Sequence, residues 1–121
     1  MSMVKYYCRN YFTCMAEWKV FFTATFEQKL GKSEKSFQNW VEKILDQLEE
    51  NPFVGKPIDT NWFREKKYGK HRIYYLVYKD LKAVYLVNMS EKKDQQAIIN
   101  SIMVLLDVYK REIEELSRHN A

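Results

Sequence analysis

The residues of this chain that could do chemistry are concentrated between positions 64 and 72. The segment reads Arg-Glu-Lys-Lys-Tyr-Gly-Lys-His-Arg, and its five cations and one anion give a net charge of +4, which equals the formal charge of the whole 121-residue chain. It continues directly into residues 73–78, whose aromatic and β-branched side chains favour a strand. Cations at the edge of a rigid sheet predict a site for a polyanion, most simply a nucleic-acid backbone. The alternative interpretation is a solvated basic hairpin without a ligand.

Other residue types with chemical potential are few. Cys8 and Cys14 match no zinc-binding spacing, and the two histidines, His71 and His119, lie far apart in the sequence. We therefore expect neither a metal nor a cofactor. The cysteines are expected to be free thiols, with a disulfide as the alternative in an oxidising compartment. No secretory signal and no run of roughly 18 apolar residues is present, so we expect a cytoplasmic protein without a membrane partner.

The composition predicts one folded domain. Hydrophobic residues make up 46% of the chain and aromatic residues 16%, which is typical of a globular protein. Residues 1–14 have no clear period and are expected to be an appendage, either a mis-called start or a short arm that docks on the domain. Residues 15–121 are expected to form the single domain.

A strand and two helices are predicted before the cationic segment. Residues 18–24 favour a strand, and Thr25 followed three residues later by Gln28 fits a capping box at a helix start. A second helix is predicted over 33–50 and should end at Asn51 because Pro52 follows it. Its apolar stripe has helical spacing and consists of Phe37, Val41, Ile44, Leu45 and Leu48.

Three strands and a helix are predicted in the second half. Residues 62–68, 72–78 and 83–89 favour strands, and the two short connections between them indicate an antiparallel meander. An amphipathic helix is predicted from about residue 94 to about residue 117. At about 1.5 Å per residue it would be roughly 36 Å long, so we expect its last turns to project or to form a homodimer through this C-terminal helix. The alternative is a core helix that frays at its end.

The order of these elements and two local motifs resemble the RelE/ParE superfamily of toxin–antitoxin proteins. Leu-Glu-Glu-Asn-Pro-Phe at 48–53 is similar to the end of that family's second helix. Gly-Lys-His-Arg-Ile-Tyr-Tyr-Leu-Val at 69–77 is similar to its meander, in which an arginine opens the central strand. The resemblance covers roughly residues 18–98. It implies an α+β fold with an N-terminal strand and helical hairpin on a mostly antiparallel sheet, and an antitoxin partner whose helix covers a groove of the toxin.

The RelE branch of this family implies a metal-independent endoribonuclease that cuts ribosome-bound mRNA. Cations held beside the reacting phosphate stabilise the charge that develops in the transition state. By this resemblance Arg72 grips the phosphate, Lys66 is the general base of a strand pair with Arg64, and Lys92 stands where the general acid is expected. The residues expected to bind RNA are Arg64, Lys67, Lys70, His71 and Lys93, of which His71 and Lys93 are also substitutes for the acid.

Two departures from the RelE pattern favour an alternative function. Ile98 stands where an aromatic residue should orient the target base, and Lys92 replaces an arginine. The alternatives are a non-catalytic binding module, a ParE-type inhibitor of a topoisomerase such as DNA gyrase, or a plain nucleic-acid-binding domain. The nuclease requires Arg64, Lys66 and Arg72 to converge on one exposed patch.

Overall fold

The computed structural model describes residues 5–7 and 17–119, and the side chains of residues 17–119. Its strands and helices, in chain order, are β1 (Lys5–Tyr7), β2 (Lys19–Phe22), α1 (Ala24–Gly31), α2 (Lys35–Glu50), β3 (Lys56–Ile58), β4 (Thr60–Tyr68), β5 (His71–Tyr78), β6 (Ala83–Glu91), α3 (Gln95–Val104) and α4 (Leu106–His119). Short 3₁₀ turns η1 (Pro52–Val54), η2 (Lys79–Leu81) and η3 (Lys92–Asp94) complete the described elements.

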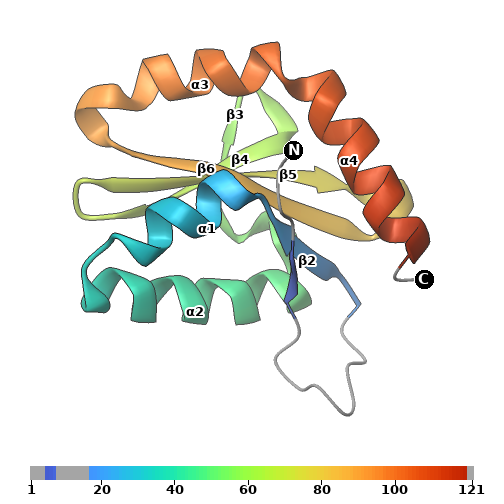
Figure 1. Ribbon diagram of the computed structural model, residues 1–121, viewed down its shortest axis with the longest axis horizontal. Coiled ribbons are helices and arrows are strands. Elements are labelled where there is room, and N and C mark those ends of the chain that lie inside the picture. Colours follow the sequence, from blue (N-terminus) through green and yellow to red (C-terminus); the bar gives the residue numbers. More distant parts are fainter. Residues whose placement is uncertain (1–4, 8–16, 120–121) are drawn as a thin grey trace.

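The described strands form one mixed sheet in the order β1-β2-β6-β5-β4-β3. The β2–β6 pair is parallel and the other neighbouring pairs are antiparallel. Strands β4, β5 and β6 follow one another as a meander, and α1 and α2 form a helical hairpin beside the sheet (Figure 1). The predicted α+β fold class and the predicted meander are therefore confirmed.

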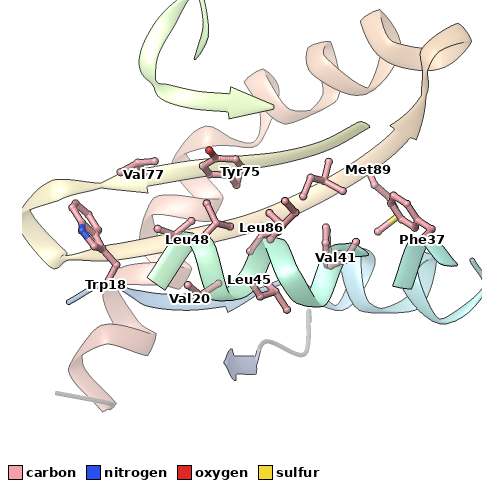
Figure 2. Packing of buried hydrophobic residues seen from close by; sticks show 14 residues of the cluster. Trp18, Val20, Phe37, Val41, Leu45, Leu48, Tyr75, Val77, Leu86 and Met89 are labelled. Atoms are coloured by element: carbon pink, nitrogen blue, oxygen red, sulfur yellow. The ribbon is translucent and has the colours of Figure 1, made fainter. Parts of the chain in front are cut away.

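Helices α1 and α2 cover one face of the sheet. Alternate side chains of β5 point towards them, and Tyr75 and Val77 lie over the apolar stripe of α2 (Figure 2). The stripe predicted from the sequence is the buried one, with Val41 and Leu48 fully enclosed. This core packs the helical hairpin against the meander.

Helices α3 and α4 cover the opposite face (Figure 1). Tyr74 and Leu76 of β5 point this way and pack with Ile102 of α3 and Ile113 of α4. Both faces of the central strands are buried, which explains why β5 and β6 are apolar almost throughout rather than alternating.

The C-terminal helical segment predicted from about 94 to about 117 is present, but Leu105 divides it into α3 and α4, so it is not one continuous helix. Leu105 leaves the helical conformation and its N–H bonds to the carbonyl of Ile102, one turn back. The interruption turns α4 so that Tyr109 and Ile113 continue the contact with the sheet, and the ring of Tyr109 packs edge-on against Tyr85. The apolar stripe is therefore used within the chain, and the homodimer through this helix stays a prediction.

The predicted helix start is also wrong by two residues. Thr23, not Thr25, is the N-cap of α1, and its Oγ1 accepts a hydrogen bond from the N–H of Phe26 at 3.1 Å. The same hydroxyl donates to the carbonyl of Val87 at 2.9 Å, where the β5–β6 register shifts. Thr23 is buried between the end of β2 and the first turn of α1, whereas Thr25 is exposed.

The segment expected to be an appendage contributes one strand. β1 pairs antiparallel with β2 at the edge of the sheet, with Lys5 opposite Phe22. Cys8, Cys14 and the rest of residues 1–14 lie outside the described residues. Across the described chain, every helix is too short or too polar to cross a bilayer.

Replacing Thr23 with alanine should destabilise the fold. The substitution removes the cap and leaves the carbonyl of Val87 without this donor, so the free energy of unfolding should fall by about 2 kcal/mol. Urea denaturation at constant m-value measures the change. Thr25→Ala is the matched control and should change the free energy by less than about 0.5 kcal/mol. A larger effect at Thr25 would restore the capping box predicted there.

The tyrosines between α4 and the sheet, Tyr78, Tyr85 and Tyr109, should make the fold sensitive to alkali. Burial raises the pKa of Tyr78, Tyr85 and Tyr109. The pKa of Tyr85 is raised further by the Glu112 carboxylate, which accepts a hydrogen bond from its hydroxyl at 2.7 Å. An unfolded tyrosine releases its proton at about pH 10. The contribution of these tyrosines to the free energy of unfolding is therefore complete below that pH and is lost as the pH rises above it. Circular dichroism from pH 8 to 12 should show this loss of stability. Tyr85→Phe should reduce the number of protons released on unfolding by about one. An unchanged number would contradict the raised pKa of Tyr85.

Candidate functional site

The β4–β5 register places the three cations that were predicted to converge, Arg64, Lys66 and Arg72, on two opposite faces of the sheet. Arg64 is opposite Tyr75 and Lys66 is opposite Ile73, which both point to the α1–α2 face. Arg72 is opposite Lys67 and shares the α3–α4 face with Tyr74. The predicted convergence of Arg64, Lys66 and Arg72 on one patch is therefore wrong.

The tight β4–β5 turn is the physical reason for this separation. Gly69 and Lys70 alone connect the paired residues Tyr68 and His71, and Gly69 has a φ of +59°, a conformation that favours glycine. With this turn Arg72 pairs with Lys67. Because side chains alternate along a strand, Lys66 points the other way.

Arg64 is buried, with 6% of its surface exposed, and its guanidinium binds backbone carbonyls. One Nη donates to the backbone and side-chain oxygens of Asn61 at 3.1 and 2.8 Å. The other donates to the carbonyl of Phe53 at 3.0 Å and to that of Gly55. The guanidinium also lies 5.2 Å from the centre of the Phe53 ring. Arg64 therefore fastens the connection between α2 and β4.

Tyr75 and Gly55 complete this fastening. The Tyr75 hydroxyl donates to the carbonyl of Pro52 at 2.8 Å and accepts from the N–H of Gly55 at 3.0 Å. A Cβ at position 55 would lie 2.6 Å from that hydroxyl and 2.5 Å from the carbonyl oxygen of Glu65. Only glycine fits this close approach without displacing backbone.

Arg72 has the same low exposure and closes the β4–β5 turn. Its Nη1 donates to the carbonyls of Gly69 and His71 at 2.8 and 3.0 Å. Its buried Nε has no partner among the described residues. On the same face, Glu65 is buried and accepts a hydrogen bond at 2.8 Å from Gln95, the first residue of α3. The start of α3 therefore covers this polar layer.

The remaining predicted cations lie near the turn, and most are exposed. Lys66 is half-buried, with its Nζ 3.5 Å from the carbonyl oxygen of Val54. The backbone N–H of Lys92 donates to the carbonyl of Lys70 at 2.7 Å, which places η3 beside the turn. Glu91 lies 3.1 Å from the Nζ of Lys70 and 3.6 Å from that of Lys93. The exposed lysines at this end are Lys67, Lys70, Lys92 and Lys93.

These lysines affect the titration of Glu91. A hydrogen bond from Lys70 and the positive charges of Lys70 and Lys93 hold the pKa of the Glu91 carboxyl below its usual range. Glu91 therefore stays ionised and neutralises part of the positive charge at this end of the molecule. The structure thus brings Lys70 and Lys93 together but separates both from Arg64.

Sequence reasoning missed an aromatic cluster beside these lysines. His71 points away from the Arg72 side, as strand alternation predicts, and its ring centre lies 4.6 Å from that of Phe37. Trp40 and Tyr68 join the same cluster. The available signal was the helical spacing of Phe37 and Trp40 together with the position of Tyr68 two residues after Lys66.

A groove of about 470 Å³ lies at the other end of the β4–β5 pair. Trp62 at the start of β4, Leu81 of η2 and Leu106 of α4 contribute apolar walls, and Lys110 and Glu114 contribute charges of both signs. Trp62 is 43% exposed. The described residues contain no group of three or more His, Cys, Asp or Glu side chains that could hold a metal ion.

Replacing Arg64 with methionine should lower the free energy of unfolding, because Arg64 has a structural role and is not only a possible ligand contact. The carbonyls of Phe53, Gly55 and Asn61 would lose a charged donor, so we expect a loss of about 3 kcal/mol in the free energy of unfolding. Lys66→Met on the same strand face is the control and should change it by less than about 0.5 kcal/mol. Equal stability of the two variants in urea titrations would show that Arg64 is not a structural residue.

Comparison with known proteins gives one family. Residues 18–96 match the sequence model of the ParE toxin of the type II toxin–antitoxin system parDE. No curated protein and no solved structure gives a significant match. The matched segment begins at the Trp18 that packs beside β2, contains the helical hairpin and the whole meander, and ends at the start of α3. Because this segment is well over half of the chain, the protein belongs to the ParE toxin family of type II toxin–antitoxin systems.

Proposed function

We propose that this toxin is a non-catalytic protein of the ParE type, which arrests growth by binding a topoisomerase such as DNA gyrase. The observation that carries the proposal is the burial of Arg64 and Arg72 on opposite faces of the sheet. A nuclease of the RelE kind would need these cations at one phosphate.

Neither arginine can reach a phosphate at low cost. Turning Arg64 outwards would leave the carbonyls of Phe53 and Gly55 without their donor, and an unsatisfied buried carbonyl costs about 1–3 kcal/mol. Arg72 would have to leave the turn carbonyls that it binds, and α3 covers the face on which it lies. The geometry therefore favours binding over phosphate chemistry.

The residue at the expected base-orienting position supports the same conclusion. Ile98 stands where the RelE pattern has an aromatic side chain, and it is half-buried against the core beneath α3. It therefore contributes to the packing of α3 rather than offering a ring to a base.

A RelE-like endoribonuclease acting on mRNA at the ribosome is the second candidate. The observation that favours it is the gathering of Lys67, Lys70, Lys92 and Lys93 at one end of the molecule. In that case lysines alone would have to supply the general base and general acid. Lys66 and Lys92 remain the predicted residues for those roles.

An antitoxin is the partner implied by membership of this family. In the proposed function the target is a second protein, and a topoisomerase would place the toxin in the cytoplasm. Inhibition is then stoichiometric, because each bound toxin molecule blocks one enzyme complex. A nuclease would instead turn over.

Controlled expression separates the two candidates. The wild-type chain should stop growth, abolish supercoiling by purified gyrase in proportion to the amount of toxin added, and leave mRNA intact in primer-extension assays. Lys92→Gln removes the predicted general acid at an exposed position and should leave all three results unchanged. Rapid mRNA cleavage that Lys92→Gln abolishes, with gyrase unaffected, would contradict the proposal and support the nuclease. Co-expression of the antitoxin should restore growth in either case.

A further inference from the structure

The aromatic cluster between α2 and the β4–β5 turn has an organisation that the proposed function does not use. We call Phe37, Trp40, Tyr68 and His71 the ring cluster. The rings of Phe37 and Trp40 are stacked with centres 5.7 Å apart, and Tyr68 lies 5.1 Å from Trp40 and 6.0 Å from Phe37. The start of α2 and the β4–β5 turn, which supply these rings, lie at the same end of the molecule in Figure 1.

The ring cluster has a buried base and an open surface. Phe37 is 1% exposed and belongs to the core beneath α2. Tyr68 is 37% exposed and Trp40 is half-buried, so these two rings offer aromatic surface to solvent. Because Phe37 holds them from below, a flat ligand would meet rings that are already fixed in place.

Two lysines, Lys66 and Lys70, lie beside this open surface. Lys66 shares the strand face of Tyr68 and His71, Lys70 lies in the turn, and Lys67 points to the other side of the same strand. Glu91, opposite His71 in the register, pairs with Lys70 and removes part of the charge. Lys66 and Lys67 form no ion pair among the described residues.

We infer that the ring cluster and its lysines form a binding site for single-stranded nucleic acid. A base would stack on Tyr68 and Trp40, and Lys66 and Lys70 would contact the flanking phosphates. Aromatic stacking combined with a cationic track is the usual mode of single-strand binding. A duplex keeps its bases stacked on one another, so it could use only the lysines.

This inference goes beyond the proposed function and requires no topoisomerase. DNA and RNA single strands share the recognised chemistry, since both have unpaired bases and a phosphate backbone. The inference differs from the predicted RNA site because it rests on Trp40 and Tyr68, and because it assigns no role in binding to Arg64 or Arg72.

Fluorescence anisotropy of labelled 12-nucleotide strands tests the inference with the full chain. Oligo-dT and oligo-U should bind, and a duplex of the same length should bind at least tenfold more weakly at 150 mM salt. Tyr68→Ala should weaken single-strand binding about tenfold or more, since stacking on one base contributes about 1–3 kcal/mol. Lys66→Gln should lower the dependence of log affinity on log salt by about 0.7.

Trp62→Ala is the matched control. Trp62 is an exposed aromatic residue on the same strand, but it lines the groove at the other end of the β4–β5 pair. It should leave the affinity unchanged, whereas Trp40→Phe, which keeps a ring, should retain most of it. Circular dichroism of each variant checks that the fold is intact.

Three results would overturn the inference: equal binding by Tyr68→Ala and wild type, equal binding of duplex and single strand, or equally good competition by polyglutamate, which would identify an acidic peptide as the ligand. Tighter binding of oligo-U than of oligo-dT would support the site and identify RNA as its ligand. The reverse order would support the site and identify DNA. Failure of these assays with gyrase inhibition intact would reject the inference alone. If gyrase activity is unaffected while single-strand binding is intact, only the proposed function is rejected.

Discussion

The hydrogen bonds from the buried guanidinium of Arg64 to the carbonyls of Phe53, Gly55 and Asn61 fix the chain between α2 and β4. That segment carries no helix longer than one turn, so its polar backbone groups are satisfied by the side chains of Arg64 and Tyr75 and by the pairing of β3 with β4. Strand β4, which follows this segment, is held in register against β5 by the two-residue turn at Gly69 and Lys70. The faces on which Arg72, Lys66 and Lys67 lie follow from this register.

Helices on both faces of the sheet leave only its edges and ends for recognition. Charged residues in the middle of β4 and β5 must then be buried and satisfied by the protein itself, as Arg64, Glu65 and Arg72 are. The end near Lys70 presents lysines and aromatic rings, while the end near Trp62 presents an apolar groove. A toxin must engage both an antitoxin and a target, and two separate surfaces with different chemistry are compatible with two such partners.

Local sequence signals predicted most of the fold. The apolar stripe of α2, Pro52 at its end and the short connections around Gly69 and Asp80 depend on neighbours in the chain, so the meander and the helical hairpin were found. The division of the C-terminal helical segment into α3 and α4 was not predicted, because the break at Leu105 depends on contact with the sheet.

The burial of Arg64 and Arg72 could not be predicted either. A cation next to a strand looks the same in sequence whether it faces solvent or a carbonyl, and a one-residue change of register exchanges the faces. Thr23 was missed as a cap because its burial depends on Val87, 64 residues away.

Chemical modification of arginine tests the central claim most directly. Phenylglyoxal reacts with accessible guanidinium groups, and peptide mass spectrometry reads each site separately. In the native protein Arg64 and Arg72 should be protected, while the exposed Arg111 and Arg118 react, and all four should react after denaturation. Modification of Arg64 and Arg72 in the native state at the rate of Arg111 would contradict the account, because both guanidinium groups would then be open to solvent and to a phosphate.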